Sequence, residues 1–312
     1  MISRISGSPG ISPFHDFWTA RSLTNSWAIT GQLSLPGEVM GYEFEVAALG
    51  AQAGFSDISY RCVTEISGPE TLAFVSALAG DRTDAFAQGT DRAIVWCDAE
   101  GFARGSGRVA LKTYEEAILV SAIPDGHWLR PAAEPFDVRL TQIEAAGLRL
   151  AGPEAGNVLN LCARKTDGAC GAEFAGLGPV LALRGPGDAT DLWCRPEQAL
   201  GLAWAIEHSG ARPCGTHAMR AWATANGALT PNLDWAPVQW ADRATDARSR
   251  EQLTGSGFAV LGWSGTVSQG VSNAVYWPAL GQTLAIVWLP SLTRPSPSAP
   301  GGSMIIAATA TD

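Results

Sequence analysis

A pattern that occurs twice in this chain constrains its fold more than any other feature. Residues 55–67 alternate between apolar and polar side chains, which predicts one strand. This segment leads into Gly68-Pro69, and a predicted helix follows to residue 79. The same order recurs at Gly152-Pro153, with a helix to residue 159. Proline is favoured at the first position of a helix because no intrahelical partner exists there for an N–H group. The repeat of strand, Gly-Pro and helix indicates an internal duplication. We therefore expect an α+β protein with two related halves.

The last part of the chain has a different pattern, with short strand-like segments and no helix. A stretch rich in Pro, Ser and Gly, residues 291–302, is predicted to be a surface loop. Strands are predicted at residues 259–263, 265–268, 283–289 and 303–309. We expect a small β-barrel domain here. The predicted division is an N-terminal α+β part over residues 1–145, a second α+β half over 146–250 and the β-barrel over 251–312.

Composition narrows the possible partners. With 46% hydrophobic and 16% charged residues, the 312-residue chain can bury a large core. Its formal net charge of −9 repels phosphate backbones, so we expect no nucleic-acid partner. No apolar run approaches the roughly 20 residues of a membrane helix, and no leader segment is recognisable. We therefore expect a cytoplasmic protein without a membrane partner, and the oligomeric state stays open.

Side chains that often carry metal or nucleophilic chemistry are few. The six cysteines form no C-x-x-C pair and there are only four histidines, so we expect reduced thiols and no metal site. The chain contains no G-x-S-x-G nucleophile motif and no G-x-G-x-x-G motif after a strand. The 12 tryptophans are many, and indole rings can form the flat walls of a pocket for an aromatic ligand.

Five short motifs occur in order along the chain, at residues 12–16, 54–60, 66–70, 98–101 and 150–155. In this order they resemble the motifs T-P-L-Y-D-x-H, G-L-F-D-V-S-H, v-x-G-P-x-A, N-E-x-G and L-x-G-P-x-A of the folate-binding aminomethyltransferase superfamily, which includes the glycine cleavage T-protein. The resemblance implies a T-protein-like fold, with three parts in a ring around a central channel that holds tetrahydrofolate.

The resemblance also implies a cofactor site. In the family a strand carboxylate accepts hydrogen bonds from the pterin edge, a planar pair of donors that suits a carboxylate. Asp191 stands at the matching position, before the helix predicted from Pro196, and Trp193 is assigned to the same cofactor site. The alternative is that Asp191 is an ordinary aspartate at the end of a strand.

Two departures from the family weaken the case for aminomethyl transfer. The G-Y-T-G-E turn before the carboxylate is lost, and Gly105 and Ser106 replace an acidic pair near the reacting folate nitrogen. Without a carboxylate there, the positive charge that develops at this nitrogen is not stabilised. Arg104 and Arg108 in the same segment are predicted to attract an anionic group of the substrate or cofactor, or else belong to a solvated hairpin.

The candidate catalytic residues are Tyr60, which replaces a family histidine, and His217 with Arg220. On a helix, spacing i, i+3 places His217 and Arg220 on one face, where they can hold a phenolate, although this is also the pattern of an ordinary helix surface. Residues 224–231 and 265–274 faintly resemble the tetrahydrofolate-dependent aromatic O-demethylases.

Three functions follow from the resemblance. The first is a tetrahydrofolate-dependent methyl or one-carbon transferase, such as an O-demethylase, that acts on a small anionic aromatic molecule. The second is a folate-independent lyase on the same scaffold that releases formaldehyde from an aromatic substrate. The third is a non-catalytic subunit of an amine-oxidising complex.

Overall fold

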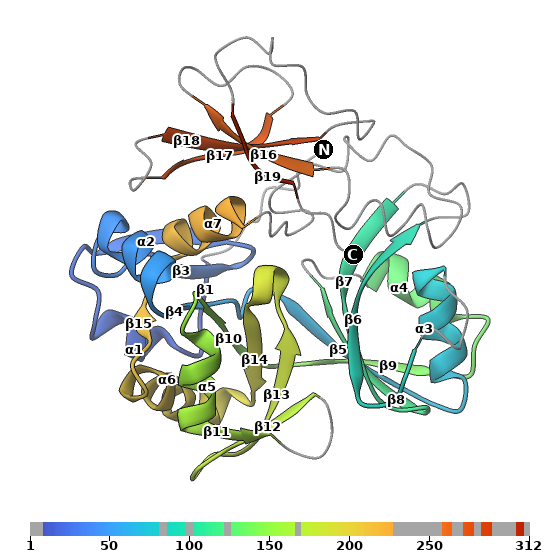
Figure 1. Cartoon of the computed structure of the whole chain (residues 1–312). Helices are drawn as coiled ribbons and strands as arrows, with labels where there is room; N and C mark the ends of the chain where they lie inside the picture. Colours follow the sequence, from blue (N-terminus) through green and yellow to red (C-terminus); the bar gives the residue numbers. More distant parts are fainter. Residues whose placement is uncertain are drawn as a thin grey trace.

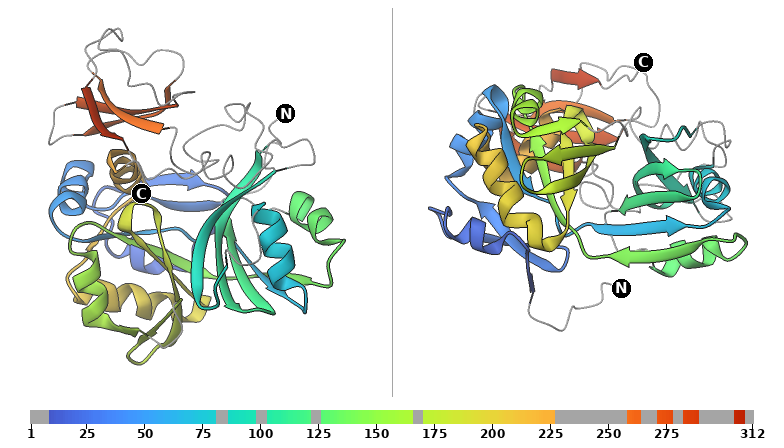
Figure 2. Two further views of the ribbon diagram at one scale, coloured as in Figure 1. Left: turned by 45° about the vertical axis from the view of Figure 1, so that its right-hand side comes forward. Right: turned by 90° about the horizontal axis from the view of Figure 1, so that it is seen from below.

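The structure is a computed structural model that describes most of the chain. Its described residues are 9–80, 86–97, 103–121, 126–165, 170–226, 258–263, 271–277, 282–288 and 304–308. Two large sheets lie beside each other with helices on their outer sides, and the smaller C-terminal sheet lies next to them (Figure 1). The view from below separates the two large units clearly (Figure 2).

The first unit is an antiparallel five-stranded sheet in the order β6-β7-β8-β5-β9. Its elements are β5 (Cys62–Ser67), α3 (Thr71–Ala79), β6 (Thr90–Cys97), β7 (Ala103–Thr113), β8 (Glu116–Ser121), α4 (Gly126–Ala133) and β9 (Arg139–Ile143). Alternate strand residues such as Val109 and Leu111 pack against Phe74 and Leu78 of α3. Ala110, between them, faces the other unit, so this sheet is buried on both faces.

The second unit is a seven-stranded sheet in the order β11-β12-β13-β14-β10-β4-β15. Its elements are β4 (Gly54–Asp57), β10 (Ala146–Ala151), α5 (Ala155–Cys162), β11 (Ala163–Lys165), β12 (Gly171–Phe174), β13 (Gly178–Arg184), the 3₁₀ turns η2 (Pro186–Asp188) and η3 (Pro196–Gln198), β14 (Thr190–Cys194), α6 (Ala199–His208) and β15 (Arg212–Pro213). The helices α5 and α6 cover one face of this sheet through Val158 and Leu202.

The two units repeat one topology, as the Gly-Pro pattern predicted. In each, a strand leads through Gly-Pro to a helix and then to a meander whose last strand pairs with the first: β8 with β5, and β14 with β10. Gly68 (φ 142°) and Gly152 (φ 101°) occupy equivalent places, and a Cβ atom on either would collide with a backbone carbonyl oxygen. The α+β class is confirmed.

The units also exchange a strand. β4 precedes β5 along the chain but pairs with β10 of the second unit, whereas β9 precedes β10 but pairs with β5 of the first. The segment 55–67, which alternation predicts as one strand, is therefore two strands in different sheets. The crossing between them, residues 58–61, lies at the junction of the two units.

The N-terminal segment packs on the second unit. It contains β1 (Gly10–Ile11), α1 (His15–Thr19), β2 (Ser26–Thr30), β3 (Leu33–Glu38) and α2 (Tyr42–Ala51), and β1, β3 and β2 form a small sheet. Phe14, Phe17 and Trp18 share one core with Leu148 and Leu192. The predicted boundary after residue 145 follows the duplication along the chain, whereas in space residues 10–57 pack with the residues that follow 145.

The C-terminal strands form an antiparallel sheet in the order β17-β18-β16-β19, next to α7 (Thr216–Ala225) (Figure 1). They are β16 (Phe258–Trp263), β17 (Val271–Trp277), β18 (Gln282–Trp288) and β19 (Met304–Ala308). Three predicted strands are confirmed, β17 was missed, and the strand predicted at 265–268 lies outside the described residues. The β-barrel and the ring around a channel stay predictions.

Candidate functional site

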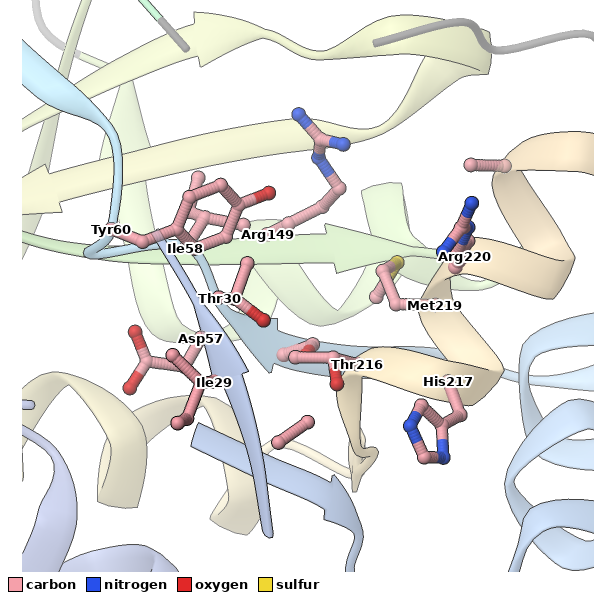
Figure 3. A pocket seen from close by; sticks show the side chains of 13 residues that line it. Ile29, Thr30, Asp57, Ile58, Tyr60, Arg149, Thr216, His217, Met219 and Arg220 are labelled. Atoms are coloured by element: carbon pink, nitrogen blue, oxygen red, sulfur yellow. The ribbon is translucent and has the colours of Figure 1, made fainter. Parts of the chain in front are cut away.

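A cavity of about 220 Å³ lies between β2, the end of β4 and α7 (Figure 3). It brings together all three predicted catalytic residues, although they come from distant parts of the chain. Its lining residues are Ala28, Ile29, Thr30, Ser56, Asp57, Ile58, Tyr60, Arg149, Thr216, His217, Met219, Arg220 and Ala223.

The floor of the cavity contains part of a polar row across the second sheet. Ser56 of β4 pairs in register with Arg149 of β10, and Arg149 pairs with Asp191 of β14. Because side chains directly opposite each other in neighbouring strands share a face, all three side chains lie on the same side of the sheet. Arg149 is 3% exposed and Asp191 is 4% exposed. The Arg149 guanidinium donates from Nε to Oδ1 at 2.7 Å and from Nη2 to Oδ2 at 2.8 Å.

Asp191 is therefore a buried carboxylate in a bidentate ion pair. Burial by itself raises its pKa, but Arg149, Arg61 and Arg108 lower it, and the net pKa lies below the ordinary value. The Arg61 guanidinium is 3.9 Å from Oδ2. Asp191 does not border the cavity, and both of its oxygens are bound by Arg149. Its contact with a pterin stays a prediction, and the expectation of an exposed aspartate at a strand end does not describe it.

The predicted catalytic residues differ in their surroundings. Tyr60 follows β4 in the crossing between the sheets, and its side chain lies against Gly31. His217 and Arg220 belong to α7, so the helix that their spacing required is present. The His217 side chain is 50% exposed, and its Nδ1 is 3.8 Å from the Glu38 carboxylate.

Arg108 and Trp193, which are also predicted cofactor residues, do not line the cavity. Arg108 of β7 donates from Nε to Asp91 at 2.9 Å and to the carbonyl oxygen of Arg184, and burial lowers the pKa of its guanidinium. It thus joins the two sheets and is not a solvated hairpin residue. Trp193 is buried between the sheets, and its Nε1 has no partner among the described residues. The side chain of Arg104 lies outside what the structure describes.

Ser56 and Arg149 also line the cavity, but they are not predicted as site residues from the sequence. Ser56 is inside a recognised motif, but nothing in the motif distinguishes a serine that faces a cavity from one that faces a core. Arg149 sits among the buried residues Leu148 and Leu150, where a charged residue signals a buried partner. That signal was present in the sequence, but only the strand register identifies the partner as Asp191.

Asp57 borders the same cavity, but its carboxylate turns to the opposite face of β4 (Figure 3). It accepts hydrogen bonds from Trp18 Nε1 at 3.0 Å, from the Ser59 N–H at 2.9 Å and from the Ser12 hydroxyl. Burial raises its pKa although these donors oppose the shift. A raised pKa beside a cavity often indicates a functional group. Here the side chain faces the core, so we assign Asp57 a structural role.

A second buried carboxylate holds α7 in place. Glu45 of α2 accepts hydrogen bonds from the N–H groups of Met40 at 2.7 Å and Gly41 at 3.2 Å, and from that of Gly215 at 2.7 Å. Gly215 is the N-cap residue just before α7 and, as a glycine, has no side chain to cap this helix. The position of the first turn of α7 beside the cavity therefore depends on Glu45.

The described residues contain no group of three or more His, Cys, Asp or Glu side chains that could hold a metal ion. Within the same part of the chain, none of the helices combines the length and apolarity needed to cross a membrane.

Comparison with known proteins defines the fold. No family model matches the sequence, and a comparison with curated proteins gives no match. The chain is similar to the crystal structure of glycine cleavage system aminomethyltransferase T from Bartonella henselae, with a TM-score of 0.70 and 16% identity over 91% of this chain and 90% of that one. A heterotetrameric sarcosine oxidase from Corynebacterium sp. U-96, in complex with pyrrole 2-carboxylate, matches 64% of this chain and 93% of that one at a TM-score of 0.41 and 15% identity. The chain thus has the fold of the glycine cleavage aminomethyltransferase.

Proposed function

We propose that this chain is an enzyme of one-carbon chemistry, whose small anionic substrate binds in the cavity between β2, β4 and α7. The shared fold supports the class of chemistry. The observation that carries the proposal is a set of side chains around the cavity whose polar groups can donate hydrogen bonds. These donors are the hydroxyls of Thr30, Ser56, Tyr60 and Thr216 and the guanidinium groups of Arg149 and Arg220. Among the described lining residues the one carboxylate, that of Asp57, faces away.

Tetrahydrofolate does not fit the described residues as the resemblance implies. The carboxylate expected to read the pterin edge, Asp191, has both oxygens bound by Arg149. At Gly105, where the family has an acid, a Cβ atom would collide with the indole of Trp96, so an acidic side chain needs a different local packing. The cavity is also below the roughly 300–1,000 Å³ of pockets for drug-sized ligands, so it suits a single small ring.

These features favour the folate-independent version of the proposal, a lyase that releases formaldehyde from a hydroxymethyl-substituted aromatic acid. In such a reaction the hydroxyl group loses its proton and the bond between the ring and the hydroxymethyl carbon breaks. The electron pair passes to the ring carbon, which then takes up a proton. Tyr60 and His217 border the cavity and carry groups that can move these protons, and Arg220 can stabilise negative charge on the ring or its substituents.

A second candidate is a tetrahydrofolate-dependent methyl or one-carbon transferase, with O-demethylation as its best-defined form. The similarity to an aminomethyltransferase along 91% of the chain favours it. When bound, tetrahydrofolate would supply the nitrogen that accepts the carbon.

One assay separates the two candidates. Formaldehyde is measured after incubation with hydroxymethyl and methoxy aromatic acids, with and without tetrahydrofolate. Release without folate, reduced by His217→Gln and Tyr60→Phe, supports the lyase. Methyl transfer only in the presence of folate, together with a rise in melting temperature when folate is added, supports the transferase. Absence of both activities, in protein whose cooperative unfolding shows that it is folded, contradicts the proposal.

A further inference from the structure

The hydroxyl of Ser56 has an unusual environment. Its side chain is 1% exposed and borders the cavity, yet its Oγ has no hydrogen-bond partner among the described residues. A buried hydroxyl without a partner costs folding free energy, so native structures rarely keep one unless a ligand or water satisfies it. Ser56 lies opposite Arg149 in the strand register, so hydroxyl and guanidinium occupy one face of the cavity floor.

The first turn of α7 meets the same cavity. Thr216 and His217 both line it, and Figure 3 shows this end of α7 beside Thr30 of β2. The N–H groups of a helix's first turn have no intrahelical acceptors and carry a partial positive charge, so they attract anions. The first turn of α7 contains no acidic residue, and the N–H group at this end that Glu45 binds is that of Gly215, just before the helix.

The groups around the cavity floor carry a small net positive charge, which suits a ligand with one negative charge. Arg149 and Asp191 neutralise each other, while the helix end contributes about half a positive charge. Arg220 also borders the cavity, from the exposed side of α7, where solvent screens its charge. A singly charged planar group with two acceptor oxygens therefore suits the floor better than a phosphate dianion.

We propose that Ser56, Arg149 and the first turn of α7 form a carboxylate-binding subsite, which holds the carboxylate of a small aromatic acid on the cavity floor. The carboxylate accepts hydrogen bonds from the Ser56 hydroxyl and the N–H groups of α7, and the aromatic ring lies towards Tyr60 and Met219. This inference rests on the proposed function for the identity of the substrate, but binding to the subsite can be measured without catalysis.

The test measures binding of benzoate, of benzamide as its uncharged analogue, and of inorganic phosphate, by calorimetry and melting temperature. Benzoate should bind, and benzamide and phosphate should bind more weakly. Ser56→Ala should lower the benzoate affinity about tenfold or more, the usual effect of losing a hydrogen bond to a charged group. Unliganded Ser56→Ala should melt at or above the wild-type temperature, because the lost hydroxyl has no hydrogen-bond partner among the described residues.

Ser76→Ala is the matched control. Ser76 is equally buried but belongs to α3 of the other unit, and its hydroxyl donates to the Leu72 carbonyl at 2.7 Å. This substitution should cost stability and leave benzoate binding unchanged. Unchanged affinity in Ser56→Ala overturns the subsite, as does tighter binding of phosphate than of benzoate, or no binding of benzoate at all.

The same variants separate the subsite from the proposed function. If wild-type protein releases formaldehyde and Ser56→Ala does so with an unchanged KM, the subsite is wrong and the function stands. If Ser56→Ala loses benzoate binding but no formaldehyde appears with any aromatic acid, the subsite stands and the function is wrong.

Discussion

Asp191→Asn is the substitution that tests the central ion pair of the site most directly. It removes the charge of Asp191 and leaves the Arg149 guanidinium buried without its counter-ion. Both side chains are almost completely inaccessible, and two short hydrogen bonds join them. Breaking one half of such a buried pair typically costs about 3–5 kcal/mol. Since asparagine keeps one acceptor oxygen, we expect about 3 kcal/mol, a large part of the roughly 5–15 kcal/mol that stabilises a typical protein.

The loss should depend on pH in a defined direction. The pKa of Asp191 is lowered in the folded protein, so the ion pair contributes stability above the carboxyl's unfolded pKa and loses it as pH falls through the folded pKa. The wild-type and variant proteins should therefore differ fully near pH 7 and converge at strongly acidic pH. Urea unfolding followed by tryptophan fluorescence measures the difference, and hydrogen exchange should assign it to β10 and β14.

Two further variants make this prediction decisive. Glu173→Gln removes an exposed carboxylate from β12 of the same sheet and should change stability by no more than about 0.5 kcal/mol. The double variant Arg149→Met with Asp191→Leu replaces the pair by apolar side chains and should recover most of the lost stability. A neutral Asp191→Asn variant, or a double variant no better than the single one, would refute the argument from the buried ion pair.

Three other predictions concern buried groups away from this pair. The raised folded pKa of Asp57 contributes stability that is fully present below the carboxyl's unfolded pKa and is lost as pH rises through the folded pKa. Urea midpoints of Asp57→Asn should therefore show a flatter pH dependence than wild type in the mildly acidic range, and an unchanged slope contradicts this. Gly152→Ala should destabilise the chain by roughly 1–3 kcal/mol or more, because φ is positive there and the added Cβ meets the carbonyl of Gln52, whereas Gly156→Ala, where a Cβ meets nothing, should be tolerated. Burial raises the pKa of Cys194 to about 12, so a thiol reagent at pH 8 should label it only after unfolding, and rapid labelling of the native protein would show that the strand opens locally.

Much of the fold follows from local rules that a sequence displays. Gly68-Pro69 and Gly152-Pro153 predicted both helix starts and the duplication, because proline and glycine impose backbone restrictions that depend little on distant residues. The error at residues 55–67 has a different origin. Alternation of apolar and polar residues continues through the crossing, and nothing local indicates that the chain leaves one sheet and enters another.

In the site, too, some features follow from the local sequence and others depend on strand pairing. Tyr60 was recognised through a motif, and His217 and Arg220 through helix spacing, and all three border one cavity. Asp191 was recognised by its place in the sequence, but its partner was not, since Arg149 is 42 residues away. The mutual position of these two residues depends on the register of β10 against β14, which the packing of the whole sheet determines.

The sequence by itself thus determined the α+β class, the duplicated units and the three residues beside the cavity, because these depend on backbone preferences and regular spacing within short segments. Only the tertiary structure decided which carboxylates are available. It paired Asp191 with Arg149, turned Asp57 into the core and placed Ser56 beside the cavity, with no hydrogen-bond partner for its hydroxyl among the described residues. The physical reason is that the accessibility and charge of a side chain depend on neighbours brought together from distant segments, and strand pairing, not sequence distance, selects those neighbours.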